Sequence, residues 1–148
     1  MRRSRTQAGF TLLELLIVVA IIGIMVAIAI PALQYALDKS KQRVTLSDLR
    51  MVSGALMQYS LDLSIYPNQS VTITQLMDIL APFSGESLPE QDRWGNDFDY
   101  RAQGEEYYSL ESFGRDGIDG TNIEYLTRND FNQDLIHSNG FFAASPDP

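Results

Sequence analysis

A single carboxylate stands inside a long apolar run near the N-terminus. Glu14 is the one charged residue in segment 9–31, GFTLLELLIVVAIIGIMVAIAIP. A charged side chain costs about 2.5–3.5 kcal/mol at the centre of a membrane helix. The charge of Glu14 therefore requires a partner, and this residue is the main clue to function.

A second candidate site is the acidic stretch near the C-terminus, formed by segments 116–120 (DGIDG) and 130–134 (DFNQD). Calcium takes about six to eight oxygen ligands from carboxylates, amides and backbone carbonyls. The stretch does not match an EF-hand, because Ile118 stands where an oxygen ligand is required. The residues alone support calcium binding and an ordinary solvated loop of turn-forming Asp and Gly about equally.

The remaining titratable side chains form weaker patterns. His137 is the only histidine, so a histidine-based metal site or a Ser-His-Asp triad has little to draw on. We expect His137 at the surface, and the acid pairs Asp97/Asp99 and Glu105/Glu106 in solvent beside a hairpin turn. Since no catalytic motif is present, the sequence predicts that the protein is not an enzyme.

The elements that position Glu14 begin with a membrane-spanning helix. The uncharged residues 15–30 would rise ~24 Å as an α-helix, and the flanking apolar residues extend this to ~36 Å. This length crosses a hydrocarbon core of ~30 Å, which predicts one transmembrane helix over residues 10–33. Arg2, Arg3 and Arg5 precede it without a balancing acid, so the N-terminus is expected on the cytoplasmic side.

A cleaved secretory signal peptide is the simplest alternative for this segment. The basic leader is present, and the small residues around Ala29 would serve as a cleavage site. Against this alternative, the apolar run is long, Glu14 lies inside it, and no polar break follows Pro31.

The helical period continues past Pro31. This predicts one helix from about residue 10 to about residue 63, with a bend at Pro31, which lacks a backbone donor. Residues 34–64 would form its amphipathic half, packed on a globular domain of residues 65–148. The periodic apolar residues recur every three to five positions and are Leu33, Leu37, Val44, Leu49, Val52, Leu56, Tyr59 and Leu63.

The globular part is expected to hold a short helix and a small sheet. Residues 71–80 predict a helix capped near Ser70 or Thr72, followed by a loop over 81–91. Segments 98–102 and 107–113 predict a hairpin around 103–106, with a weaker third strand at 123–127. The predicted fold class is α+β, in which a long N-terminal α-helix packs on a small antiparallel β-sheet.

Charge and composition exclude several functions. The 148 residues carry 11 basic and 19 acidic side chains, which gives a net charge of −8. This acidic balance disfavours nucleic-acid binding, because phosphate contacts need Lys and Arg. The absence of cysteine excludes disulfides and thiol catalysis.

The segment 9–14, GFTLLE, resembles the processing motif of type IV prepilins and type II secretion pseudopilins. The resemblance implies that residues 1–9 are a cytoplasmic leader, cleaved by a prepilin peptidase between Gly9 and Phe10. It also implies N-methylation of the new terminal Phe10. Glu14 would pair with the N-terminal amine of a neighbouring subunit during filament assembly.

Landmarks later in the chain are similar to those of the major pseudopilin of type II secretion systems. They are Tyr66-Pro67, DRWGN at 92–96, YSL at 108–110 and GRDG at 114–117. Arg93 stands where that family usually has proline, and residues 121–129 form an insertion.

The same resemblance implies a metal ion, because major pseudopilins bind calcium in the corresponding C-terminal loop. Carried over residue by residue, Asp116 would be a calcium ligand, together with Asp130 or Asp134 in the second acidic segment.

The implied function is a structural subunit of a type II secretion pseudopilus, a helical filament that drives protein export. The implied partners are other copies of the chain, minor pseudopilins, the prepilin peptidase, the inner-membrane assembly platform and the outer-membrane secretin. The implied location is the bacterial inner membrane, with the C-terminal domain in the periplasm.

Two alternatives stay open. One is a related filament, namely a type IV pilin for adhesion or motility, or a competence pseudopilin for DNA uptake. The other is a membrane-anchored or secreted binding module or enzyme, which predicts processing after Ala29 or no processing at all.

Overall fold

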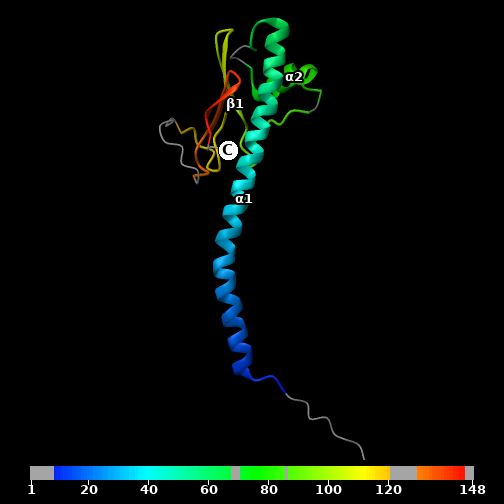
Figure 1. The fold of residues 1–148 in the computed structure, drawn as a ribbon. Helices are drawn as coiled ribbons and strands as arrows, with labels where there is room; N and C mark the ends of the chain where they lie inside the picture. Colours follow the sequence, from blue (N-terminus) through cyan, green and yellow to red (C-terminus); the bar gives the residue numbers. More distant parts are fainter. Residues whose placement is uncertain (1–8, 68–70, 86, 121–129, 146–148) are drawn as a thin grey trace, which may run out of the picture. The chain divides into compact units, whose positions relative to one another are not determined.

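The computed structural model describes residues 9–67, 71–85, 87–120 and 130–145. Two helices, α1 (Leu12–Leu63) and α2 (Ile73–Ser84), are followed by four described strands in one antiparallel sheet of order β1-β2-β3-β4 (Figure 1). The strands are β1 (Asp99–Gln103), β2 (Tyr107–Ser112), β3 (Leu135–Ser138) and β4 (Phe141–Ala144). The predicted α+β class is confirmed.

The helix α1 begins and ends within two residues of its predicted bounds and continues through Pro31. It is the one helix of the described chain that is long and apolar enough to span a membrane. The chain divides into two compact units between Leu37 and Asp38. In the first unit the apolar side chains of α1 are exposed along the whole run, from Phe10 onward.

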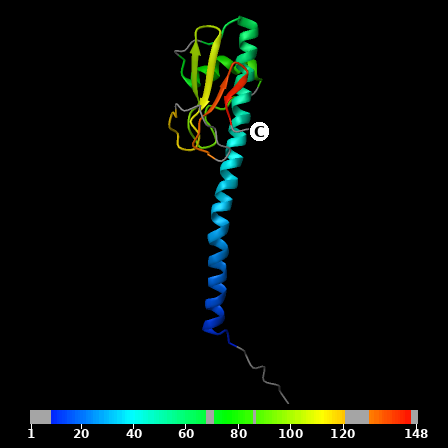
Figure 2. The same ribbon diagram turned by 60° about the vertical axis from the view of Figure 1, so that its left-hand side comes forward.

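The second unit contains the hydrophobic core, in which the C-terminal part of α1 lies beside the sheet (Figure 2). Leu49, Val52 and Leu56 of α1 are fully buried, at the helical spacing that places them on one face. Each such side chain contributes about 1.5–3 kcal/mol when removed from water. The side chains that meet them include Leu76 and Leu80 of α2 and Tyr100, Tyr108 and Leu110 of the sheet.

The helix α2 begins with a capping box, in which Thr72 and Gln75 exchange hydrogen bonds between side chain and backbone. The prediction that a loop starts at residue 81 is wrong, because α2 continues through Pro82 to Ser84. Phe83 in the last turn packs edge-on against Tyr59 of α1, with 5.2 Å between ring centroids. This tertiary contact holds the last turn helical despite the proline.

The predicted hairpin of β1 and β2 is confirmed, with Gln103 paired to Tyr107 across the turn. The strands β3 and β4 were not predicted. They are joined by Asn139-Gly140, both with positive φ, which is a strong signal for a two-residue hairpin turn. The predicted strand at 123–127 lies outside the described residues.

Candidate functional site

The carboxylate of Glu14 completes the N-terminal cap of α1. One of its oxygens, Oε2, accepts hydrogen bonds from the backbone N–H and the hydroxyl of Thr11, both at 3.1 Å. The Thr11 hydroxyl oxygen accepts in turn from the N–H of Glu14 at 3.2 Å. This reciprocal arrangement is a capping box, and it places a negative charge at the positive end of the helix dipole. The Thr-x-x-Glu spacing before an apolar run could have revealed it from the sequence.

The two residues before this cap are non-helical and accessible. Gly9 and Phe10 belong to no helix, and Phe10 is 76% exposed. Nothing lies within 4 Å of the position that a Cβ on Gly9 would occupy. The peptide bond between these two residues is therefore open to a peptidase, which must reach the backbone.

Three carboxylates from three separate segments form the acidic cluster. Glu111 lies on β2, Asp119 in the loop that follows, and Asp134 directly before β3. Each offers one oxygen, and these oxygens lie within 4.8 Å of one another. Glu111 and Asp134 are each 6% exposed, whereas Asp119 is open to solvent.

Asp134 has one satisfied and one unsatisfied oxygen. Its Oδ2 accepts a hydrogen bond from the N–H of Gly120 at 2.8 Å. Its Oδ1 is buried and accepts no hydrogen bond from the described residues. Burial raises the pKa of the Asp134 carboxyl, and burial likewise raises that of Glu111, against the opposing effect of Arg101. A buried acceptor without a donor is costly, which indicates that a cation or a proton belongs there.

The structure assigns different places to the predicted calcium ligands. Asp134 lies in the acidic cluster, whereas Asp116 and Asp130 are not among its three members. Their Oδ1 atoms accept from the N–H groups of Ile118 and Asn132, two residues on, at 3.2 and 3.0 Å. Such bonds are typical of Asx turns.

Sequence reasoning missed Glu111 and did not single out Asp119. The position of Asp119 inside the DGIDG segment was a usable signal. Glu111 could not be found that way, because only the antiparallel register of β2 and β3 brings it toward Asp134.

The acidic cluster fits the calcium ion that the resemblance implies. The groups that it offers are all carboxylate oxygens, the type of ligand that hard cations such as calcium prefer. The unpartnered Oδ1 of Asp134 supplies a buried negative charge that a divalent cation would neutralise.

A buried hydrogen-bond network supports the loops next to the cluster. The Oδ1 atom of Asp92 accepts from the backbone N–H groups of residues 94, 95 and 96, each at 2.9 Å. Its Oδ2 accepts from Ser112 at 2.8 Å, and the Asn96 amide donates to the carbonyl of Gly114 at 2.7 Å. The two landmark motifs, DRWGN and GRDG, are thereby joined to each other and to the end of β2.

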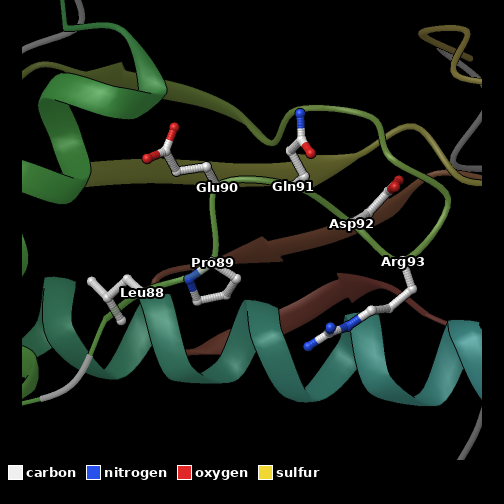
Figure 3. Close-up of a pocket in the computed structure, with 6 residues that line it drawn as sticks. All are labelled: Leu88, Pro89, Glu90, Gln91, Asp92 and Arg93. Carbon is white, nitrogen blue, oxygen red and sulfur yellow. The ribbon is translucent and has the colours of Figure 1, made fainter.

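The same loop is attached to α1 by ionic contacts. Figure 3 shows a hollow lined by residues 88–93, in which Arg93 extends toward α1. The Arg93 guanidinium donates two hydrogen bonds, at 2.8 and 3.0 Å, to the buried carboxylate of Asp48. Asp38 accepts from the indole N–H of Trp94 at 3.2 Å and from Arg115 at 3.1 Å. Trp94 thus anchors its turn to α1.

The expectation that His137 lies at the surface is wrong. It is 4% exposed, on the face of β3 that meets the core, where its Nδ1 lies 3.5 Å from the Tyr108 hydroxyl. Its ring packs edge-on against Phe142, with 4.7 Å between centroids. Burial lowers the pKa of His137, and the nearby Arg50 lowers it further.

Comparisons with known proteins match most of the chain. The family model for type II secretion system (T2SS), protein G, matches residues 32–127, and the model for the prokaryotic N-terminal methylation motif matches residues 4–30. The chain is 32% identical over 139 residues to type II secretion system core protein G of Vibrio cholerae, which covers 84% of this chain and 93% of the relative. It is 33% identical over 131 residues to the proteins of that name in Pseudomonas aeruginosa, with coverages of 80% and 90%, and Escherichia coli, with coverages of 82% and 90%.

Proposed function

Since this chain belongs to the family of type II secretion system protein G, the major pseudopilins, we propose that it assembles into the helical filament of a type II secretion pseudopilus. The family is structural and not enzymatic, and the N-terminal methylation motif belongs to it. One observation carries the proposal. An exposed, non-helical Gly9–Phe10 bond directly precedes a capped helix whose apolar side chains before Leu37 are exposed in the described structure.

Leader removal generates the partner that Glu14 requires. Cleavage between Gly9 and Phe10 leaves an amine on Phe10, which is then N-methylated and stays cationic. The second oxygen of Glu14, Oε1, makes no hydrogen bond with the described chain, since both cap bonds go to Oε2. The amine of a neighbouring subunit can therefore pair with Glu14 while the cap stays intact. In an apolar filament core an unpaired carboxylate is heavily penalised, so this pairing also rejects wrong registers.

The exposed apolar part of α1 would be covered first by the lipid bilayer and then by other subunits of the filament. In the inner membrane it spans the bilayer, with the N-terminus cytoplasmic and the globular domain periplasmic. In the pseudopilus the same surface packs against the helices of other subunits. Such contacts are heterologous and build an open filament, because the rotation between subunits need not close.

The other components follow from the secretion system to which the family belongs. The prepilin peptidase cuts and methylates the chain, and an inner-membrane assembly platform extracts it from the bilayer. Minor pseudopilins join the filament, and its growth moves folded proteins through the outer-membrane secretin.

We assign the acidic cluster to calcium within this function. Glu111, Asp119 and Asp134 would hold the ion, and it would supply the positive charge that joins β2, the following loop and the start of β3. The cluster itself provides few of the ligands that calcium takes, so backbone carbonyls and water would have to complete the set.

Mass spectrometry of the N-terminus of the protein purified from its membrane tests the processing step. The proposal predicts a chain that starts with N-methylated Phe10. A chain that starts at Ile30, or that retains Met1, would exclude a pseudopilin and favour the signal-peptide or anchored-enzyme alternatives.

A further inference from the structure

An arginine of the described structure lies against the acidic cluster. Arg101, on β1, donates to the Oδ2 of Asp119 at 2.9 Å and lies 3.6 Å from the Oε2 of Glu111. It also forms an ion pair with Asp99, which lies two residues before it on the same strand. Its side chain is 47% exposed, so it enters the cluster from the solvent side.

The acidic cluster and its neighbour Asp99 carry more negative charge than Arg101 can neutralise. Asp99, Glu111, Asp119 and Asp134 contribute four carboxylates, while Arg101 is the one basic group within ion-pair distance of any of them in the described chain. The unpartnered Oδ1 lies on Asp134, a residue that is 94% buried, and Arg101 makes no ion pair with Asp134 in the described structure. One carboxylate of the cluster therefore stays open to a second cation.

We propose that Arg101 is a tethered cation that competes with the calcium ion for Asp119 and Glu111, and thereby sets the affinity of the acidic cluster for calcium. This inference rests on the calcium site assigned above. The guanidinium holds two of the three ligands when the ion is absent, so the loop after β2 stays attached to the sheet. A bound ion would share these carboxylates with Arg101 or displace it from them. In either case the positive charge of Arg101 would repel the ion.

The direction of the effect follows from electrostatics. The repulsion between a guanidinium and a divalent cation a few ångströms apart weakens ion binding, since both are attracted to the same oxygens. Removing the guanidinium charge removes this repulsion and leaves the carboxylates with less neutralisation. Both changes favour the calcium-bound state over the free state.

Isothermal titration of the full-length chain in an uncharged detergent, with calcium chloride, tests the inference. We expect Arg101→Gln to lower the Kd for calcium by about tenfold, and Arg101→Lys, which keeps the charge, to bind much as the parent chain does. Arg43→Gln is the matched control, because Arg43 is exposed and makes no ion pair or hydrogen bond in the described structure. The rise in melting temperature with calcium, relative to a chelator, should be larger in Arg101→Gln than in the parent chain.

The outcomes separate the inference from the function on which it rests. Equal or weaker calcium binding by Arg101→Gln, in a chain with the parent's circular dichroism, would overturn the role of Arg101 and leave the calcium site standing. No binding by any variant would overturn both. Arg101→Met keeps the aliphatic stem and serves as a second charge-free variant. None of these results depends on processing at Gly9, so the filament is tested independently.

Discussion

At the scale of single residues, the two carboxylate oxygens of Glu14 differ in their contacts, which leaves one of them for the intersubunit pairing that we propose. Its Oε2 caps α1 through Thr11, and its Oε1 is available for a cation from another subunit. The cap explains how a carboxylate can stand at the start of a membrane helix ahead of assembly, since the helix N-terminus stabilises negative charge. In the proposed assembly, the ion pair would become available only after leader cleavage creates the Phe10 amine.

The burial of His137 has a consequence for stability. Arg50 of α1 and Tyr108 of β2 are the charged and titratable groups that face it, and its pKa lies below the ordinary value of 6.5. Below that value the unfolded chain binds a proton that the folded chain excludes. The free energy of unfolding therefore falls as the pH drops from the ordinary pKa toward the lower pKa of the folded chain. The contribution of His137 is fully present above the ordinary pKa.

We predict that the free energy of unfolding of the parent chain decreases on the order of 1 kcal/mol more than that of His137→Gln between about pH 7 and about pH 5. Fluorescence of Trp94, the only tryptophan, reports unfolding by denaturant in both chains. Glu111 and Asp134 also titrate in acid. Both chains contain these two residues, so their effects on the free energy of unfolding cancel when the chains are compared. Parallel pH profiles for the two chains would show that His137 stays accessible to protons.

At the scale of elements, the loop after β2 is fixed by contacts with the segment before β3. A Cβ on Gly114 would lie 2.8 Å from the backbone oxygens of both Phe131 and Gln133, and its φ is +66°. Neither oxygen can move easily, because both belong to the backbone. Close approach of these two segments is what brings the acidic stretches together.

We predict that Gly114→Ala lowers the free energy of unfolding by more than about 2 kcal/mol, because backbone strain and a steric clash add. Gly104→Ala is the matched control, since Gly104 has a similar φ of +70° and nothing within 4 Å of its Cβ position. It should lose only about 1 kcal/mol. Thermal melts of both variants measure the difference, and equal losses would contradict the close approach at Gly114.

The long helix α1 and the hairpin of β1 and β2 could be predicted from the sequence, whereas the two shortest strands could not. The apolar period of α1 runs over 52 residues and places both ends within two residues. The strands β3 and β4 have four residues each, too few for an alternating pattern to stand out, although Asn139-Gly140 marked their turn. The helix α2 extends past Pro82, a residue that ordinarily ends a helix, and Phe83 in its last turn packs on Tyr59.

The candidate functional residues also differ in how far the sequence alone could predict them. Gly9, Phe10 and Glu14 lie within six consecutive residues, so their motif could be recognised from the sequence alone. The acidic cluster depends on sheet register and on loops that meet in space, so of the three predicted ligands only Asp134 belongs to it, and Glu111 has no signal in the sequence. The contacts of Arg101 with Glu111 and Asp119 likewise depend on the fold and leave no local signal in the sequence.

At the scale of the whole molecule, the chain has a hydrophobic core in one unit and an uncovered apolar helix in the other. The second unit buries Leu49, Val52 and Leu56, whereas α1 before Leu37 leaves its apolar side chains exposed. That exposure requires a bilayer or other copies of the chain. The central claim is that assembly into a filament covers this surface and that Glu14 directs it.

Recovery of pseudopili from cells that carry Glu14→Gln tests this claim most directly. Glutamine keeps the acceptor that the capping box needs and removes only the charge, whereas Thr11→Ala removes the cap hydroxyl and keeps the charge. We predict that the Glu14→Gln chain is processed and retained in the membrane at the parent's level, but that filaments in the sheared fraction fall at least about tenfold. Thr11→Ala should still form filaments. Parent-level filaments from Glu14→Gln would contradict the claim, because the charge of Glu14 would then have no role between subunits.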